Sequence, residues 1–186
     1  MWQYWSHFKY TMIHKWYVFV ECCKRRIIWR GIKHDMSKFL PSEFFAYANF
    51  FFHEDGTRRA KGIDSGLYSR QIAAFDKSWV HHANWNDHHW NYWAEDPHNS
   101  TLTPDAKEVF GVVTNERQAV IMSIPAMKEL IADMIGASKA QGNPDPEVGA
   151  GEFFYAHKDR IVLHPLSRLW IGSEFESLAR KGRKKE

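Results

Sequence analysis

Apolar side chains recur at helical spacing in the N-terminal part of the chain. Phe8, Met12, Trp16 and Val20 are each four residues apart, and this period predicts a helix over residues 6–24. A helix of this length is the first element of a chain whose pattern is mostly helical.

Two further helices are expected on either side of a polar loop. The stretch RRIIWRGIKHD continues with helical character and is expected to break at Gly31. Pro41 suits the first turn of a helix that runs to about Phe52. The segment HEDGTRRAKGIDSG is a polar loop, and a long helix follows it from about Leu67 into the 80s.

The C-terminal half combines a short β segment with helices. Two apolar runs, EVFGVV and AVIMSI, are separated by TNERQ and predict a β-hairpin over residues 107–124. Pro125 opens a helix that ends near Gly142, because an Asn-Pro pair follows that glycine. Two more helices are predicted, one near residues 149–158 and one from about Pro165.

The pattern as a whole predicts one mainly α domain. A chain of 186 residues is the size of a single domain and can bury a substantial core. We expect a helical bundle with a small β-hairpin insertion over residues 1–180, followed by a basic, disordered tail over residues 181–186.

Composition excludes several classes of protein. The net charge of +3 comes largely from the last residues, so the body lacks the basic surplus of a protein that coats nucleic acid. No apolar run approaches the ~20 residues that cross a bilayer, and the first residues do not resemble a signal peptide. Cys22 and Cys23 are adjacent, which disfavours a disulfide between them and suits a reduced compartment. We therefore expect a cytoplasmic protein without a membrane or nucleic-acid partner.

The histidines are concentrated in one short stretch, HHANWNDHHW, over residues 81–90. If residues 76–93 are helical, His82, Asn86 and His89 lie along one face, while His81 and His88 point elsewhere. A turn that begins near Asn86 would instead bring His88 to the same side. Neutral imidazole is a common metal ligand, so either arrangement predicts a metal site.

Other segments offer matching ligands. His34 and Asp35 are adjacent, and a carboxylate can bridge two cations. Asp133 lies among apolar residues in ELIADMIGA, where a carboxylate is costly to bury unless it is paired or bound to a cation. His14 poses the same question between Ile13 and Trp16 in the first predicted helix.

The order of these residues along the chain resembles the metal-binding signature of the HD superfamily of phosphohydrolases, an all-helical fold. Its dinuclear members carry a His, an His-Asp pair, a His, a His or His-His pair, and an Asp. HDMSK is similar to the HD-x-x-K box of that group, whose lysine reaches a substrate phosphate. More narrowly, IWRGIKHDMSKFLPSEFFAYANFF, NWNDHHWNYW and VLHPLSR look like an uncharacterised family of small HD-like proteins of phage and bacterial genomes.

This resemblance implies roles for particular residues. The first metal ion would take His14, His34, Asp35 and Asp133, and the second would take Asp35 as a bridge, His82, and His89 or His88.

Lys38 would bind and polarise the substrate, and Asp35 would be essential to catalysis. Asn86 is either a substrate-binding residue or a helix cap.

The implied function is a metal-dependent phosphohydrolase that acts on a nucleotide or a related phosphate ester. The mixed nitrogen and oxygen ligands suit one or two ions of Mn, Fe, Co, Ni or Zn. Two alternatives stay open: a dinuclear-iron oxygenase built on the HD fold, and a non-catalytic metal-binding interaction protein. A phage-encoded copy would work in the host cytoplasm, and an exposed hairpin edge is compatible with a homodimer.

Overall fold

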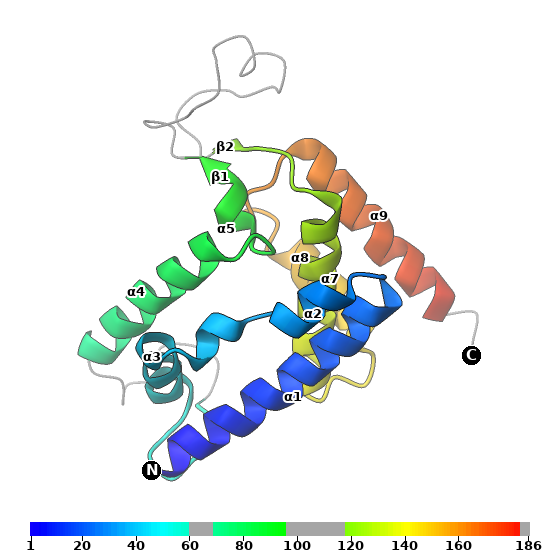
Figure 1. Ribbon diagram of the computed structural model, residues 1–186. Coiled ribbons are helices and arrows are strands. Elements are labelled where there is room, and N and C mark those ends of the chain that lie inside the picture. The colour runs from blue at the N-terminus through cyan, green and yellow to red at the C-terminus, as the bar shows by residue number, and fades with distance from the viewer. Residues whose placement is uncertain (60–68, 96–117, 183–186) are drawn as a thin grey trace.

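The computed structural model describes residues 1–59, 69–95 and 118–182 (Figure 1). This part of the chain is mainly helical, which confirms the predicted fold class. Its helices are α1 (Trp2–Lys24), α2 (Ile28–Lys33), the 3-10 helix η1 (Met36–Phe39), α3 (Pro41–Phe51), α4 (Ser69–Trp85), α5 (Trp90–Trp93), α7 (Ile124–Ala140), α8 (Pro146–Ala156) and α9 (Pro165–Gly182).

The predicted hairpin falls mostly outside the described residues. β2 (Gln118–Ala119) pairs antiparallel with β1 (Ala94–Glu95), and the expected partner run EVFGVV lies outside the described residues. The predicted end of the second strand at residue 124 is also wrong, because Ile124 already belongs to α7. The hydroxyl of Ser123 accepts a hydrogen bond from the Ala126 amide at 3.3 Å, and this cap starts the helix.

The structure describes only the first two residues of the predicted tail. Lys181 and Gly182 are the last residues of α9, so that helix continues beyond the predicted boundary at residue 180. Residues 183–186 lie outside the described chain.

The main hydrophobic core lies where α7, α8 and α9 meet. Leu130 and Ile135 of α7, Phe154 of α8 and Phe175 of α9 are almost completely buried there. Figure 1 places α9 at one edge of the molecule and α3 and α4 at the opposite edge, with α7 between them. No helix within the described ranges has the length and apolar character needed to cross a membrane.

Close backbone contacts hold α1 against α2 and α7. A Cβ on Gly136 of α7 would lie 2.5 Å from Cγ2 and 3.0 Å from the backbone nitrogen of Val18, so only glycine fits this crossing. Gly31 lies inside α2 and does not break it, contrary to the prediction. Glycine is needed there for packing, because a Cβ would lie 2.7 Å from the Cys22 side chain. Cys22 is fully buried at this junction.

Helix α1 has an unusual distribution of polarity. Its inner face carries four buried polar side chains, Gln3, His7, Thr11 and His14. The apolar positions that identified this helix in the sequence face outward, and Trp16 is 62% exposed. The helix therefore directs its polar face into the protein.

Of the two arrangements left open for residues 76–93, the structure has the turn that begins near Asn86 and not a continuous helix. α4 ends at Trp85, and a turn separates it from α5. The side-chain amide of Asn86 donates to the His82 carbonyl at 2.8 Å and closes the last turn of α4. Consequently His88 and His89 lie in the turn and not on a helical face with His82.

Candidate metal centre

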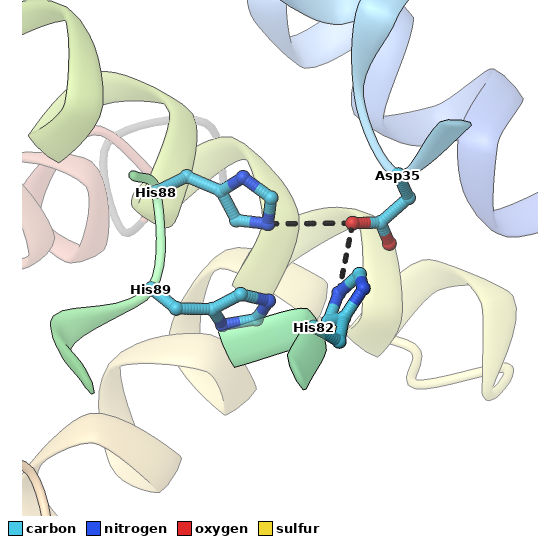
Figure 2. A group of neighbouring side chains, drawn as sticks. All are labelled: Asp35, His82, His88 and His89. Carbon is cyan, nitrogen blue, oxygen red and sulfur yellow. Dashed lines mark ion pairs between the residues drawn. The ribbon is translucent and has the colours of Figure 1, made fainter. Parts of the chain in front are cut away.

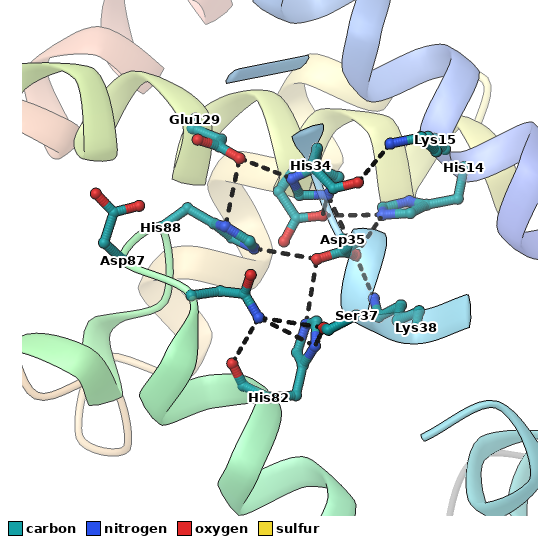
Figure 3. Close-up of polar contacts among 12 residues, drawn as sticks. His14, Lys15, His34, Asp35, Ser37, Lys38, His82, Asp87, His88 and Glu129 are labelled. Carbon is teal, nitrogen blue, oxygen red and sulfur yellow. Dashed lines mark hydrogen bonds and ion pairs between the residues drawn. The ribbon is translucent and has the colours of Figure 1, made fainter. Parts of the chain in front are cut away.

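The predicted ligands come from distant segments and meet beside α7 (Figure 3). All of them are buried except Asp133, which is partly buried. His14 lies on α1, His34 and Asp35 at the junction of α2 and η1, His82 on α4, His88 and His89 in the turn before α5, and Asp133 on α7.

The first group of ligand atoms joins α1, α7 and the α2–η1 junction. His14 Nε2 lies 3.1 Å from Asp133 Oδ1 and 3.7 Å from Asp35 Oδ2. His34 Nε2 lies 3.2 Å from Asp35 Oδ2 and 3.4 Å from Asp133 Oδ1. Two ligand atoms that are each about 2.1 Å from one ion lie about 3.0–3.4 Å apart, so most of these separations suit a shared cation.

The second group joins α4 and the turn to the same aspartate (Figure 2). Asp35 Oδ1 lies 3.2 Å from His82 Nε2 and 3.4 Å from His88 Nε2. His89 belongs to the same group, and its ring centroid is 4.2 Å from that of His88. The choice between His88 and His89 left open by the sequence is thus not exclusive, because both imidazoles are close enough to share an ion.

Asp35 takes part in both groups, with one carboxylate oxygen in each. Its backbone has a φ of 52°, in the left-handed region that aspartate adopts more readily than most residues. This conformation is enforced between α2 and η1 and directs the carboxylate between the two sets of imidazoles. A bridging carboxylate is the arrangement expected for two neighbouring ions.

The facing atoms have no hydrogen-bond partner among the described residues. They include Nε2 of His14, His34, His82 and His88, and Oδ1 of Asp35. Both ring nitrogens of His89 share this property. Buried polar atoms without partners are costly, and a bound cation would satisfy all of them at once. The donor set therefore fits a bound metal ion.

The opposite ring nitrogens of His34, His82 and His88 face carboxylates. Nδ1 of His34 lies 3.0 Å and Nδ1 of His88 lies 3.4 Å from Glu129 Oε1. Nδ1 of His82 lies 3.0 Å from Glu43 Oε2. A carboxylate on Nδ1 holds the proton there and leaves the Nε2 lone pair free for a metal ion.

These two glutamates were not predicted from the sequence. Glu129 is four residues before Asp133 on α7, so both carboxylates lie on one helical face. The four-residue spacing from Asp133 could have identified Glu129 as part of the site. Glu43 is fully buried in the first turn of α3 and gave no comparable signal.

Cations hold the surrounding carboxylates and backbone in place. Arg30 binds both Glu129 and Asp87, and so connects α2 and α7 to the turn that carries His88. The ammonium of Lys15 donates to the His34 carbonyl at 2.6 Å and fixes the α2–η1 junction against α1. The site is therefore supported from every element that contributes a ligand.

The pKa values of these groups reflect strong mutual attraction. Burial alone would lower the pKa of His34, but Asp35, Asp133 and Glu129 raise it well above its usual value. Burial would raise the pKa of Asp35, but His34 and Lys38 hold it well below its usual range. A metal ion replaces the protons shared by such groups, so its binding releases protons and strengthens as the pH rises.

Lys38 and Asn86 lie at the edge of the centre. The ammonium of Lys38 pairs with Asp35 Oδ2 and lies 5.8 Å from the centroid of the Tyr47 ring. Asn86 is occupied with His82 and Ser37, which agrees with the helix-cap alternative. The structure thus brings Lys38 to the ligands and places Asn86 against His82 and Ser37.

The chain matches one family model across residues 3–176, described as a family of unknown function (DUF5662). No curated protein and no solved structure matches it. The matched region includes every ligand of both groups, from His14 to Asp133. The chain is therefore a member of this family of unknown function.

Proposed function

We propose that the protein is a metal-dependent phosphohydrolase with an HD-like arrangement, acting on a nucleotide or a related small phosphate ester. The observation that carries the proposal is the division of the Asp35 carboxylate between two groups of buried imidazoles, with the Lys38 ammonium beside it. Hydrolysis of a phosphate ester needs charge neutralisation on the phosphoryl oxygens, and this combination provides it.

The two groups of ligand atoms would hold the ions. His14, His34, Asp35 and Asp133 form one site, and Asp35, His82, His88 and His89 form the other. When bound, divalent ions of this kind lower the pKa of a coordinated water and polarise a phosphoryl oxygen.

Lys38 has a separate role in the proposal. Its side chain is 18% exposed and that of Asp35 is 1% exposed, so Lys38 lies between the buried carboxylate and solvent. A phosphate that approaches from solvent exchanges part of the Lys38–Asp35 pair for a contact with its own oxygen. Lys38 would then orient the ester and stabilise the negative charge that develops as the P–O bond breaks.

Metal analysis and a substrate screen test the proposal together. The purified full chain is analysed for Mn, Fe, Co, Ni and Zn, and phosphate release is measured with nucleoside mono-, di-, tri- and cyclic phosphates. Asp35→Ala is expected to lose bound metal and turnover together, because it removes a ligand from both sites. Asp76→Ala, at an exposed position on α4, is the matched control and should keep both.

A second variant separates metal binding from turnover. Lys38→Gln should retain the metal and lower kcat by about 100-fold, since it removes only charge stabilisation. Full phosphatase activity in Asp35→Ala would remove the proposal. Bound iron with an oxygen-dependent paramagnetic signal, and no phosphate release under anaerobic conditions, would replace it with the oxygenase alternative.

A further inference from the structure

We infer that the outer face of α1 docks onto an anionic phospholipid surface. The α1 apolar face is the outward side of this helix. It consists of Trp2, Trp5, Phe8, Met12, Ile13 and Trp16.

These side chains are exposed to an extent that is unusual for their type. Trp2 is 67%, Trp5 52% and Trp16 62% exposed. Their spacing of three and four residues gathers them along one side of the helix, so they form a continuous strip. Contiguous exposed apolar surface of this kind marks an interaction site more often than isolated apolar residues do.

The polarity of α1 explains why the apolar side chains are outside. The inner face must supply His14 to the candidate metal centre, and Gln3, His7 and Thr11 follow it along the same side. Tryptophan and methionine are therefore left on the opposite side, where no other described element covers them to the extent that a core residue is covered.

The charge around this face selects the partner. Residues 1–34 contain a single glutamate, and their exposed charged side chains are the cations Lys9, Lys24, Arg26 and Lys33. That glutamate, Glu21, is fully buried and bound to Lys24, Arg25 and Lys139. Lys9, in the middle of the strip, is exposed and lies 5.8 Å from the centroid of the Trp5 ring.

An anionic bilayer complements both properties of this surface. Tryptophan side chains settle at the boundary between lipid headgroups and acyl chains, and neighbouring lysines are attracted by anionic headgroups. A second copy of the chain would instead present like charge, because the exposed Lys9 lies in the middle of the strip. The strip ends at Trp2 on its N-terminal side, where Gly56 in the turn at residues 53–59 packs against Trp2 and Ser6.

Docking of this kind needs no membrane-spanning segment. A helix that lies in the interface buries one apolar face and leaves the remainder of the protein in water. The absence of a spanning helix from the described ranges is therefore compatible with the proposal.

Vesicle binding by the full chain tests the inference. Sedimentation is measured with vesicles of phosphatidylcholine alone and of phosphatidylcholine mixed with phosphatidylglycerol. We expect binding to the mixed vesicles to be tighter by about tenfold or more, and to weaken at high salt. The double variant Trp5→Ser, Trp16→Ser should lose it, whereas Leu166→Ser, Leu169→Ser, on the exposed side of α9, should bind like the wild type.

A charge variant keeps the test decisive if the tryptophan variant is poorly folded by circular dichroism. Lys9→Glu lies on the same strip and should weaken binding to the mixed vesicles only. Failure to bind either vesicle, or equal binding to both, would overturn the proposal. So would light scattering that shows a lipid-free dimer which the tryptophan variant converts to a monomer, because the strip would then be a contact between copies.

Discussion

At the scale of single residues, the decisive feature is the environment of each imidazole. Nδ1 and Nε2 of His34 and His88 have different neighbours: a glutamate on one side, and aspartate oxygens on the other. This difference fixes the ring orientation before any ion is bound. Glu129 is important here because it contacts both rings, which belong to different groups of ligands.

We expect Glu129→Gln to weaken metal binding by about 10–100-fold, the usual range for loss of a carboxylate behind a metal-binding histidine. The amide keeps the size of the side chain and removes the charge that orients the His34 and His88 rings. Competition with a chromophoric chelator measures the affinity directly and does not depend on turnover.

Glu152→Gln, at an exposed position on α8, is the control for this variant. It should bind metal as tightly as the wild type. An unchanged metal affinity in Glu129→Gln would show that Glu129 serves only to pair with Arg30.

At the scale of elements, the crossing of α1 and α7 sets the distance between His14 and Asp133. Gly136 lies at the contact with Val18, one turn of α7 beyond Asp133. The helices approach this closely because glycine has no side chain.

Gly136→Ala should destabilise the protein by about 2 kcal/mol, since overpacking of a tight contact typically costs about 1–3 kcal/mol. The added methyl group meets the Val18 backbone, which cannot move aside without separating α1 from α7. Urea unfolding gives the difference in the free energy of unfolding. Metal affinity should fall as well, because His14 and Asp133 move apart.

The helical glycine Gly151 provides the comparison. A Cβ there would lie 3.5 Å from the nearest atom of Phe175, an ordinary contact. Gly151→Ala should therefore be neutral or slightly stabilising, as alanine favours a helix over glycine. Equal losses of stability in both variants would contradict the role assigned to the crossing.

The elements were largely predictable and their orientation was not. The helical spacing of apolar residues, together with Pro41, Pro125 and Pro165 at helix starts, predicted the ends of most helices within a few residues. Of the two arrangements considered for residues 76–93, the turn near Asn86 is the one observed, because Asn86 caps α4 and this cap competes locally with helix continuation. For α1 the spacing of apolar residues distinguished an apolar face from a polar face. It did not show that the polar face is the buried one.

The candidate site was predictable because its ligands are chemically unusual in their setting. Asp133 lies among apolar residues, where a carboxylate is costly to bury unless it meets a charge, and the order of the other ligands along the chain resembles the HD signature. Their convergence on Asp35 depends on the left-handed backbone of that residue, which no sequence pattern specified. The supporting residues Glu43 and Arg30 were missed because a single charged residue in a helix has many ordinary roles.

At the scale of the whole molecule, the site and the main core occupy opposite sides of α7. Glu129 and Asp133 face the imidazoles, whereas Leu130 and Ile135 enter the core with α8 and α9. α1 is attached across this boundary by the buried Glu21, whose carboxylate binds Lys139 of α7 at 2.6 Å.

Glu21 should make the stability of the protein depend on acid pH. Burial raises the pKa of this carboxyl, but its pairs with Lys139, Lys24 and Arg25 outweigh burial and lower it to about 2. Because the folded pKa lies below the unfolded value, the charged form stabilises the fold above about pH 4.5, and that contribution is lost as the pH falls toward 2.

Glu21→Gln is expected to lower the free energy of unfolding by about 2 kcal/mol at pH 7, and by much less near pH 2. Urea unfolding at several pH values gives the difference between variant and wild type. Glu174→Gln, on the exposed side of α9, should show no such dependence. A constant difference across the whole pH range would argue against the ion pairs as its source.

The burial of Cys22 has a practical consequence. Desolvation raises the pKa of its thiol to about 12, so the thiol remains protonated and shielded at neutral pH. An alkylating reagent reaches it only when α1 separates from α2, whereas the half-exposed Cys23 reacts in the closed protein. In a Cys23→Ser background, the alkylation rate of Cys22 therefore reports how often this junction opens. Added Mn²⁺ should lower that rate, because an ion bound to His14 and to its partner ligands would hold the helices together.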